Sequence, residues 1–340
     1  MTTGVPWPDV AWLLAVAAMT VYLLFGGADF GGGVWDLFSW GRDAQGQRQA
    51  IAQAMGPVWE ANHVWLLFLL ILLFTGFPAA FHELMVGLYL PLNLILLGII
   101  LRGAAFVFRA HGRHGVGRQS PWGSTFGAAS SLTVVLLGAA LAAVSTAGPL
   151  TAPWRSWLSP FALWTGLFAL AATAYLAAAY LTLETSGGLR ATFRKRALLA
   201  GGLAGLAAIV DLGLAYLEAP RLLHRLLSPG VLGLVLLVAL LGVGSYVSLR
   251  SELDRLGRFL AASALAVLLW SWAAAQWPYI IYPGFPVTAS AAPDLALRQI
   301  LTLVPFGLAL LLPSLWLLLH VFKGRLPIER GGRAGPKPTP

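Results

Sequence analysis

Polar side chains that can transfer protons lie within one long apolar segment, residues 49–77. Gln49, Gln53, Gly56, Glu60 and His63 follow one another at steps of three or four residues. Because an α-helix has 3.6 residues per turn, this spacing places all five on one helix face. A carboxylate and an imidazole on that face can accept and release protons. The pattern therefore predicts a polar stripe able to conduct protons.

The stripe is predicted to occupy only the inner part of its helix. Leu67, Leu70 and Phe74 continue the same face, so the polar part ends about 16–21 Å from the inner end at about 1.5 Å per residue. Pro57 has no backbone donor, and we expect a kink there that admits water. These features predict a half-channel from the inner side. The alternative for Glu60 and His63 is hydrogen bonding to neighbouring helices, which is a packing role.

Three further ionisable residues fall within or next to apolar segments. Asp29 follows the first segment near its inner end, Arg102 lies in the third, and Asp211 lies in the sixth. An ionisable group inside a membrane costs free energy unless it is paired or reaches water. Arg102 is expected to play a structural role, either by pairing with Asp29 or by extending to the lipid headgroups. Asp29 is also a candidate for the proton pathway, whereas Asp211 has no evident partner.

Composition indicates a polytopic membrane protein of the all-α class. The chain has 340 residues, of which 58% are hydrophobic and 10% are charged, with a mean hydropathy of +0.78. Soluble domains are about 25% charged, so a water-soluble fold of this size is excluded. The net charge of +9 comes from short basic clusters between apolar runs, a pattern typical of membrane loops. Nucleic acid is therefore not an expected partner.

Apolar runs long enough to cross a bilayer predict nine transmembrane helices packed as adjacent helical bundles. The first is not expected to be a cleaved signal peptide, since no Lys or Arg precedes it. Residues 1–325 are predicted to form one transmembrane domain, and residues 326–340 a disordered cytoplasmic tail. The nine segments are approximately 8–28, 49–77, 82–109, 122–147, 160–184, 194–217, 229–249, 256–277 and 296–321.

Loop charges predict an outside N-terminus and a cytoplasmic C-terminus. Cytoplasmic loops of membrane proteins are enriched in Lys and Arg. This orientation places all but five of the 22 Lys and Arg residues on the inside. The five exceptions are Arg102, within a segment, and Arg155, Arg221, Arg225 and Arg298 on the outside.

A haem held by this chain alone is not expected. Axial ligation needs His or Met from facing helices, and His63 is the only histidine predicted near mid-membrane, while His82 lies with Glu83 near the outer interface. The chain contains no cysteine, which excludes thiolate metal sites. We therefore expect no metal ligand and no catalytic residue in this chain.

Several motifs in residues 20–110 resemble subunit II of the cytochrome bd-type quinol oxidases. Gly27–Gly33 is similar to the family's Gly-Phe-Asp-x-Gly-x-Gly, and Gly56–Leu66 to its Pro-x-Trp-Asp/Glu-Gly-Asn-x-x-Trp-Leu. Phe77-Pro78 resembles its aromatic-Pro turn, and Leu101–Phe106 its Phe-Arg-x-x-x-Phe. His63 departs from the family, which usually has Gln or Glu at that position.

The resemblance implies a place in a respiratory complex of the bacterial cytoplasmic membrane. In the family, a partner subunit I carries two b-type haems and haem d and oxidises quinol, and subunit II packs against it as a heterodimer. The carboxylate matching Glu60 is placed on a proton path from the cytoplasm to the oxygen-reducing haem. A small single-helix accessory subunit, membrane lipid and a structural quinone are further partners compatible with the family.

Two other functions remain open from the residues. A proton-coupled secondary transporter could use Glu60 and Asp211 as coupling sites, although such transporters often contain inverted repeats with matching helix breaks. No convincing repeat is visible in this chain. The other alternative is a purely structural membrane subunit, in which Glu60 and its neighbours only hold helices together.

Overall fold

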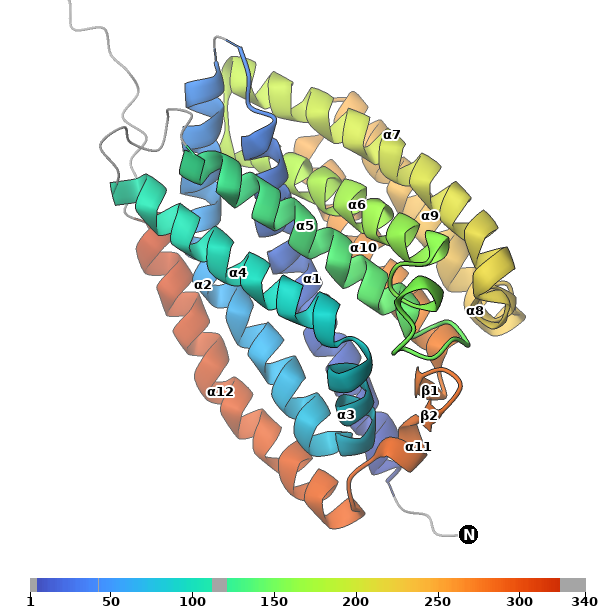
Figure 1. Ribbon diagram of the computed structural model, residues 1–340. Helices are drawn as coiled ribbons and strands as arrows, with labels where there is room; N and C mark the ends of the chain where they lie inside the picture. The colour runs from blue at the N-terminus through green and yellow to red at the C-terminus, as the bar shows by residue number, and fades with distance from the viewer. Residues whose placement is uncertain (1–4, 42, 112–120, 325–340) are drawn as a thin grey trace, which may run out of the picture.

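The computed structural model describes residues 5–41, 43–111 and 121–324, with side chains described except at 56–61, 110–111 and 318–324. This part of the chain is helical apart from one small two-stranded sheet (Figure 1). The long helices are α1 Trp7–Leu37, α2 Ala44–Gly76, α4 Tyr89–His111, α5 Pro121–Ala143, α6 Pro160–Glu184, α7 Gly187–Glu218, α9 Pro229–Arg250, α10 Asp254–Gln276 and α12 Asp294–Gly324. The short elements are α3 Pro78–Gly87, η1 Pro153–Arg155, α8 Pro220–Leu226, β1 Tyr279–Ile281, β2 Phe285–Pro286 and α11 Val287–Ser290.

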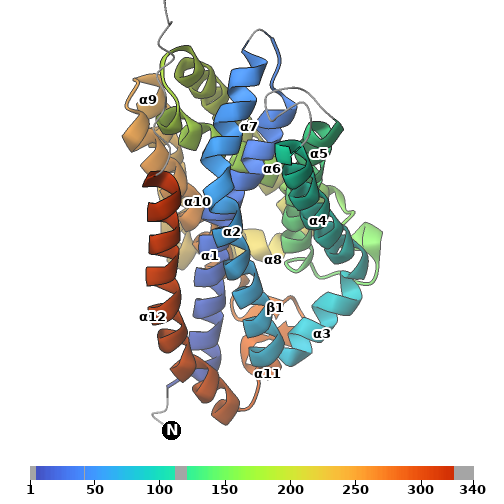
Figure 2. The same cartoon turned by 90° about the vertical axis from the view of Figure 1, so that its left-hand side faces the viewer.

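Eight of the described helices are long and apolar enough to cross a membrane, which confirms a polytopic membrane protein. The count reaches nine if residues Asn62–Gly76 of α2 are taken with α3, from which they are bent by 116°. Nine spans thus stays a prediction for the chain. The described start of α1 and the end of α12 lie at opposite ends of the bundle (Figure 2). Which end faces the cytoplasm also stays a prediction.

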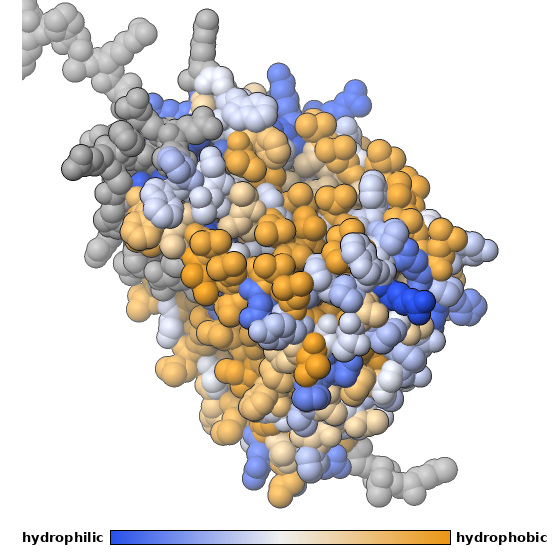
Figure 3. Space-filling model, in the orientation of Figure 1, coloured by the Kyte–Doolittle hydropathy of each residue, from blue (hydrophilic) through white to orange (hydrophobic). Residues whose placement is uncertain are grey.

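Helix α1 runs through the centre of the molecule. It packs against α2, α5, α6 and α10, while α6 packs with α7, and α9 with α10 (Figure 1). Small residues dominate the contact with α6, where Ala177, Ala178 and Ala179 are fully buried. Small side chains let membrane helices approach closely, which favours van der Waals contact between them. The outer surface is apolar over the middle of the face seen in Figure 3, as a lipid-facing surface should be.

The predicted end of the first helix, at residue 28, is wrong. Helix α1 continues through the glycines to Leu37. The glycines are there for packing: a Cβ at Gly31 would overlap the Thr173 carbonyl oxygen of α6, and a Cβ at Gly33 would overlap the Ser130 side chain of α5. Because no Cβ is present, α1 can lie against both helices, and this close packing offsets the low helix propensity of glycine.

The predicted continuous segment 82–109 is also wrong at its start. The chain forms a separate helix α3, which carries His82 and Glu83, and leaves helical geometry at Leu88 before α4 begins at Tyr89. Apolar side chains are buried at both ends of α3: Phe77, between α2 and α3, and Leu88, between α3 and α4, are each 1% exposed or less. Their burial stabilises both breaks, although the break at Leu88 contains no proline.

The connection from α10 to α12 folds over one end of the bundle. Strands β1 and β2 pair antiparallel, and Gln276 donates to the Val144 carbonyl at 2.9 Å. The guanidinium of Arg221 on α8 lies next to two rings of this connection, 4.7 Å from the centroid of Tyr279 and 4.6 Å from that of Tyr282. A guanidinium this close to an aromatic ring makes a cation–π contact, so α8 helps to hold the connection in place.

Candidate functional site

The centre of the α1, α4 and α5 contact contains a fully buried ion pair. Arg102 donates to both carboxylate oxygens of Asp29, at 2.8 and 2.7 Å, and its Nε donates to Ser130 Oγ at 3.1 Å. Phe30 and Phe126 lie 4.4 and 5.2 Å from the guanidinium carbon. The Arg102 side chain is 0% exposed and the Asp29 side chain 2%. The two-point geometry neutralises both charges inside the bundle.

The helices around this pair position each group through local contacts. Ser130 Oγ donates to the Phe126 carbonyl at 2.7 Å, so its remaining lone pairs accept from Arg102. Gly33 leaves room for the Ser130 side chain beside α1. The same glycine-lined surface that brings α1 against α5 therefore fixes the hydrogen-bond acceptor of Arg102.

A second buried ion pair lies seven residues further along both helices. Arg109 donates to Asp36 at 2.7 Å, and both side chains are 1% exposed. Phe126 contacts this guanidinium as well, at 5.1 Å. Arg48, at the start of α2, is also buried and donates to the Ser39 carbonyl at 2.6 Å. Seven residues are about two helical turns, or about 10.5 Å.

Tyr22 extends the line of polar groups in the other direction. It lies seven residues before Asp29, is 7% exposed, and its hydroxyl has no protein hydrogen-bond partner in the described structure. We call Tyr22, Asp29, Asp36, Arg102 and Arg109 the polar column. It follows one face of α1 over about 21 Å, given about 1.5 Å per residue.

The column has hydrogen-bonding capacity that the protein does not use. Asp36 Oδ1 and the Nε and Nη2 of Arg109 have no partner among the described residues, and neither does either amide atom of Asn62, which is buried against Gly26. Buried polar groups in a membrane need partners, and water commonly supplies them. Within the column these atoms lie at its two ends, at Tyr22 and at Asp36 and Arg109, where water is expected to bind, whereas the Asp29–Arg102 pair between them is satisfied by the protein.

The polar stripe of α2 faces away from the interior of this chain. Gln49 and Gln53 are exposed, whereas Ile51 and Met55 on the other side of the helix are buried. Further along, Leu67 and Phe74 are 59% and 60% exposed. His63 is half-buried, and the Glu60 side chain lies outside the described residues. Gln49 and Gln53 do share a face, and that face is on the outer surface of the chain.

The structure brings together some of the residues singled out from the sequence and separates others. Asp29 contacts Arg102 inside the bundle, while Gln49 and Gln53 lie on the surface of α2. Asp211 is bound within the chain, since Thr165 of α6 donates to its Oδ1 at 2.8 Å. It therefore joins α6 to α7.

Sequence reasoning missed three members of the column: Tyr22, Asp36 and Arg109. The signal was a repeat of seven residues. Asp36 follows Asp29 by seven, and Arg109 follows Arg102 by seven, so both pairs have the same separation along the chain. Such a match predicts two parallel contacts between the same two helices.

The described residues contain no group of three or more His, Cys, Asp or Glu side chains that could hold a metal ion. His63 lies on α2 and His82 on α3.

The fold and the column define a polytopic helical membrane protein with charged pairs buried between its first, fourth and fifth helices. Residues 7–322 match the family described as cytochrome bd terminal oxidase subunit II. The match covers most of the chain, and the chain belongs to this family. The resemblance seen in residues 20–110 is thereby confirmed.

Known proteins support the same assignment over parts of the chain. Cytochrome bd ubiquinol oxidase subunit 2 of Bacillus subtilis (strain 168) is 35% identical over 104 residues, which is 30% of each chain. A putative cytochrome bd menaquinol oxidase subunit II of the same strain is 27% identical over 88 residues, 26% of this chain and 25% of the relative. The aligned segments thus span less than a third of these relatives.

A solved structure shares the fold over nearly the whole chain. The bd oxidase from Geobacillus thermodenitrificans matches with a TM-score of 0.79 at 19% identity, covering 95% of this chain and all of the matched chain. At this identity the likeness concerns the fold.

Proposed function

We propose that this chain is subunit II of a cytochrome bd-type quinol:oxygen oxidoreductase in a bacterial cytoplasmic membrane. In the proposed complex, a haem-bearing subunit I binds two b-type haems and haem d, oxidises quinol on the outer side and reduces oxygen. This chain ligates no haem and is inactive alone. Its roles are to stabilise subunit I and to supply protons from the cytoplasm.

The outward-facing polar stripe of α2 is the observation that carries the proposal. Gln49 and Gln53 are exposed in the first turns of α2, and polar amides on the outer surface of a membrane protein need water or a partner protein to supply their hydrogen bonds. A partner protein covering this face gives them hydrogen-bond partners. Family membership makes the haem-bearing subunit the natural occupant. The stripe then lies at the interface between the two subunits.

Protons are proposed to move inward along this interface. Gln49 and Gln53 hold water at the inner end, Glu60 receives the proton at the same helical register, and His63 is one turn further along. Asp29, inside the bundle, belongs to the column rather than to this face. The ion pair with Arg102 gives Asp29 a structural role next to its proposed protonic one.

If this chain pairs with a haem-bearing subunit, the two should purify together. The full chain, affinity-tagged and purified in mild detergent, is expected to bring with it a second membrane protein that shows a haem absorption spectrum. Denaturing gel electrophoresis and visible spectroscopy measure both. A colourless chain that purifies alone and drives proton-coupled uptake of a solute into vesicles would support the transporter alternative instead.

Glu60→Gln is expected to slow oxygen reduction by about tenfold or more, because the amide cannot release a proton and positioned acid–base groups commonly contribute about 10²-fold or more. Oxygen consumption by the purified complex with saturating quinol measures the rate. Haem content should equal that of the wild type. Glu83→Gln, on α3 away from the stripe, is the matched control and should leave the rate unchanged. Equal rates for Glu60→Gln and wild type would favour the purely structural subunit.

A further inference from the structure

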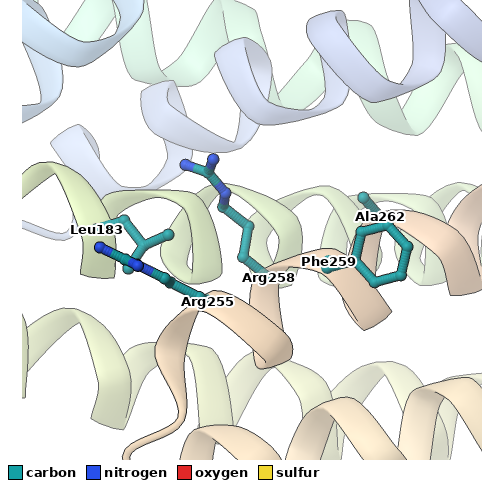
Figure 4. A pocket seen from close by; sticks show the side chains of 5 residues that line it. All are labelled: Leu183, Arg255, Arg258, Phe259 and Ala262. Carbon is teal, nitrogen blue, oxygen red and sulfur yellow. The ribbon is translucent and has the colours of Figure 1, made fainter.

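A cavity opens between the end of α6 and the start of α10. Its volume is about 410 Å³, and Leu183, Arg255, Arg258, Phe259 and Ala262 line it (Figure 4). This size is within the range of small-molecule sites, roughly 300–1,000 Å³. The cavity is separate from the polar column, because none of its lining residues belongs to α1, α4 or α5.

Four of the lining residues form one face of α10. Arg255, Arg258, Phe259 and Ala262 are spaced at i, i+3, i+4 and i+7, which is the repeat of a single helix side. The two arginines are in the first two turns and the apolar residues follow (Figure 4). Phe259 is 67% exposed. The face is therefore basic at the end of the helix and apolar further into the membrane-spanning part.

The protein neutralises these two arginines only in part. Arg255 is exposed and makes no hydrogen bond or ion pair within the part of the chain that the structure describes. Arg258 has a long contact of 3.7 Å with Glu184, and its guanidinium lies 5.0 Å from the Tyr180 ring. A contact of that length between half-exposed groups contributes little stability.

Two other acidic residues near the cavity, Asp254 and Glu252, bind an arginine outside it. Asp254 accepts two hydrogen bonds from Arg194, at 3.0 and 2.9 Å, and Glu252 accepts one at 2.7 Å. Both carboxylates are thus turned to α7 and leave Arg255 uncompensated. The start of α10 adds the positive end of the helix dipole at the same place.

We propose that this cavity binds an anionic phospholipid. The phosphate lies between the guanidinium groups of Arg255 and Arg258, and an acyl chain runs over Leu183, Phe259 and Ala262. Basic pockets between membrane helices bind anionic headgroups, because the charge attraction adds to burial of the chains. The order of basic and then apolar residues along one helix face matches the order of headgroup and chain in a lipid. A free phosphate would use only the arginines.

Native mass spectrometry of the full chain, in the complex with which it purifies, tests the site. Detergent-purified protein is titrated with phosphatidylglycerol, and separately with phosphatidylcholine carrying the same acyl chains. The wild type should retain one more phosphatidylglycerol than the double variant Arg255→Gln/Arg258→Gln, which is expected to bind it roughly tenfold or more weakly, since each basic residue near an anionic lipid contributes about fivefold. Arg250→Gln, a basic residue on α9 outside the cavity, is the matched control and should bind normally.

Two further measurements separate the lipid from other ligands. Phe259→Ala should also weaken retention of phosphatidylglycerol, since it removes apolar contact and no charge, and millimolar inorganic phosphate should not displace the lipid. If the double variant does not assemble, the single variant Arg255→Gln, at an exposed position, takes its place. Equal retention of phosphatidylcholine, competition by inorganic phosphate, or wild-type binding by the arginine variants would each overturn the proposal.

Discussion

Replacing Arg102 with methionine is expected to destabilise the protein by about 3–5 kcal/mol, the usual cost of removing one partner of a buried ion pair. Asp29 would keep a buried carboxylate with neither of its two charged hydrogen bonds. Ser130 Oγ would also lose the hydrogen bond that it accepts from Arg102 Nε. Denaturant unfolding in detergent micelles, followed by tryptophan fluorescence, measures the loss.

Arg298→Met is the control for this experiment. Arg298 is exposed near the start of α12, so its replacement should change the free energy of unfolding by about 0.5 kcal/mol or less. If Arg102→Met were as stable as this control, the buried pair would contribute nothing to the fold. A second variant, Asp29→Leu with Arg102→Met, removes both charges and should recover most of the stability, because apolar replacement of a whole pair is often neutral.

The paired variant also separates the two roles of Asp29. A purely structural pair can be replaced by apolar side chains with full recovery of both assembly and oxygen reduction. A protonic Asp29 gives a different result, in which the complex assembles with its haems and turns over slowly. The comparison of haem content with oxygen consumption in one sample distinguishes these outcomes.

The pairing of Arg102 with Asp29 could be anticipated from residue types alone. An aspartate at the end of the first apolar segment and an arginine in the third lower the cost of burial by meeting each other. The apolar runs likewise located every long helix, because spanning the hydrocarbon core needs about 20 apolar residues. Physical rules that act on single segments were therefore sufficient to locate the helices, whereas for Arg102 they left two partners open, Asp29 and the lipid headgroups.

Features that depend on packing between segments could not be predicted in the same way. The glycines from residue 26 onward predict a helix end, although in the structure they mark the surface where α1 meets α5 and α6. The sequence also does not determine whether the polar stripe of α2 faces the interior of the chain or its outer surface. In a membrane protein both the interior and the lipid-facing surface are apolar, so the spacing of Gln49 and Gln53 gives their shared face and not what covers it.

Packing of α1 against α6 makes Gly31 the most restrictive of these glycines. A Cβ there would overlap the Thr173 carbonyl oxygen and lie 2.7 Å from Ala177 Cβ. Both obstacles are short or part of the backbone, so neither can rotate away, whereas the atom nearest to a Cβ at Gly32 belongs to the flexible Met55 side chain. Gly31→Ala is therefore expected to push the helices apart and to destabilise by about 1–3 kcal/mol or more.

Gly205→Ala is the matched control, because a Cβ at Gly205 on α7 meets nothing within 4 Å. Alanine has the higher helix propensity, so this variant should be as stable as the wild type or slightly more so. The same unfolding assay compares the two variants with Gly32→Ala, which should fall between them. Loss of stability at Gly205 equal to that at Gly31 would contradict the packing argument, since a general effect of glycine replacement would then explain both. A selective loss at Gly31 shows that this glycine acts through its missing Cβ, which lets α1 lie directly against α6.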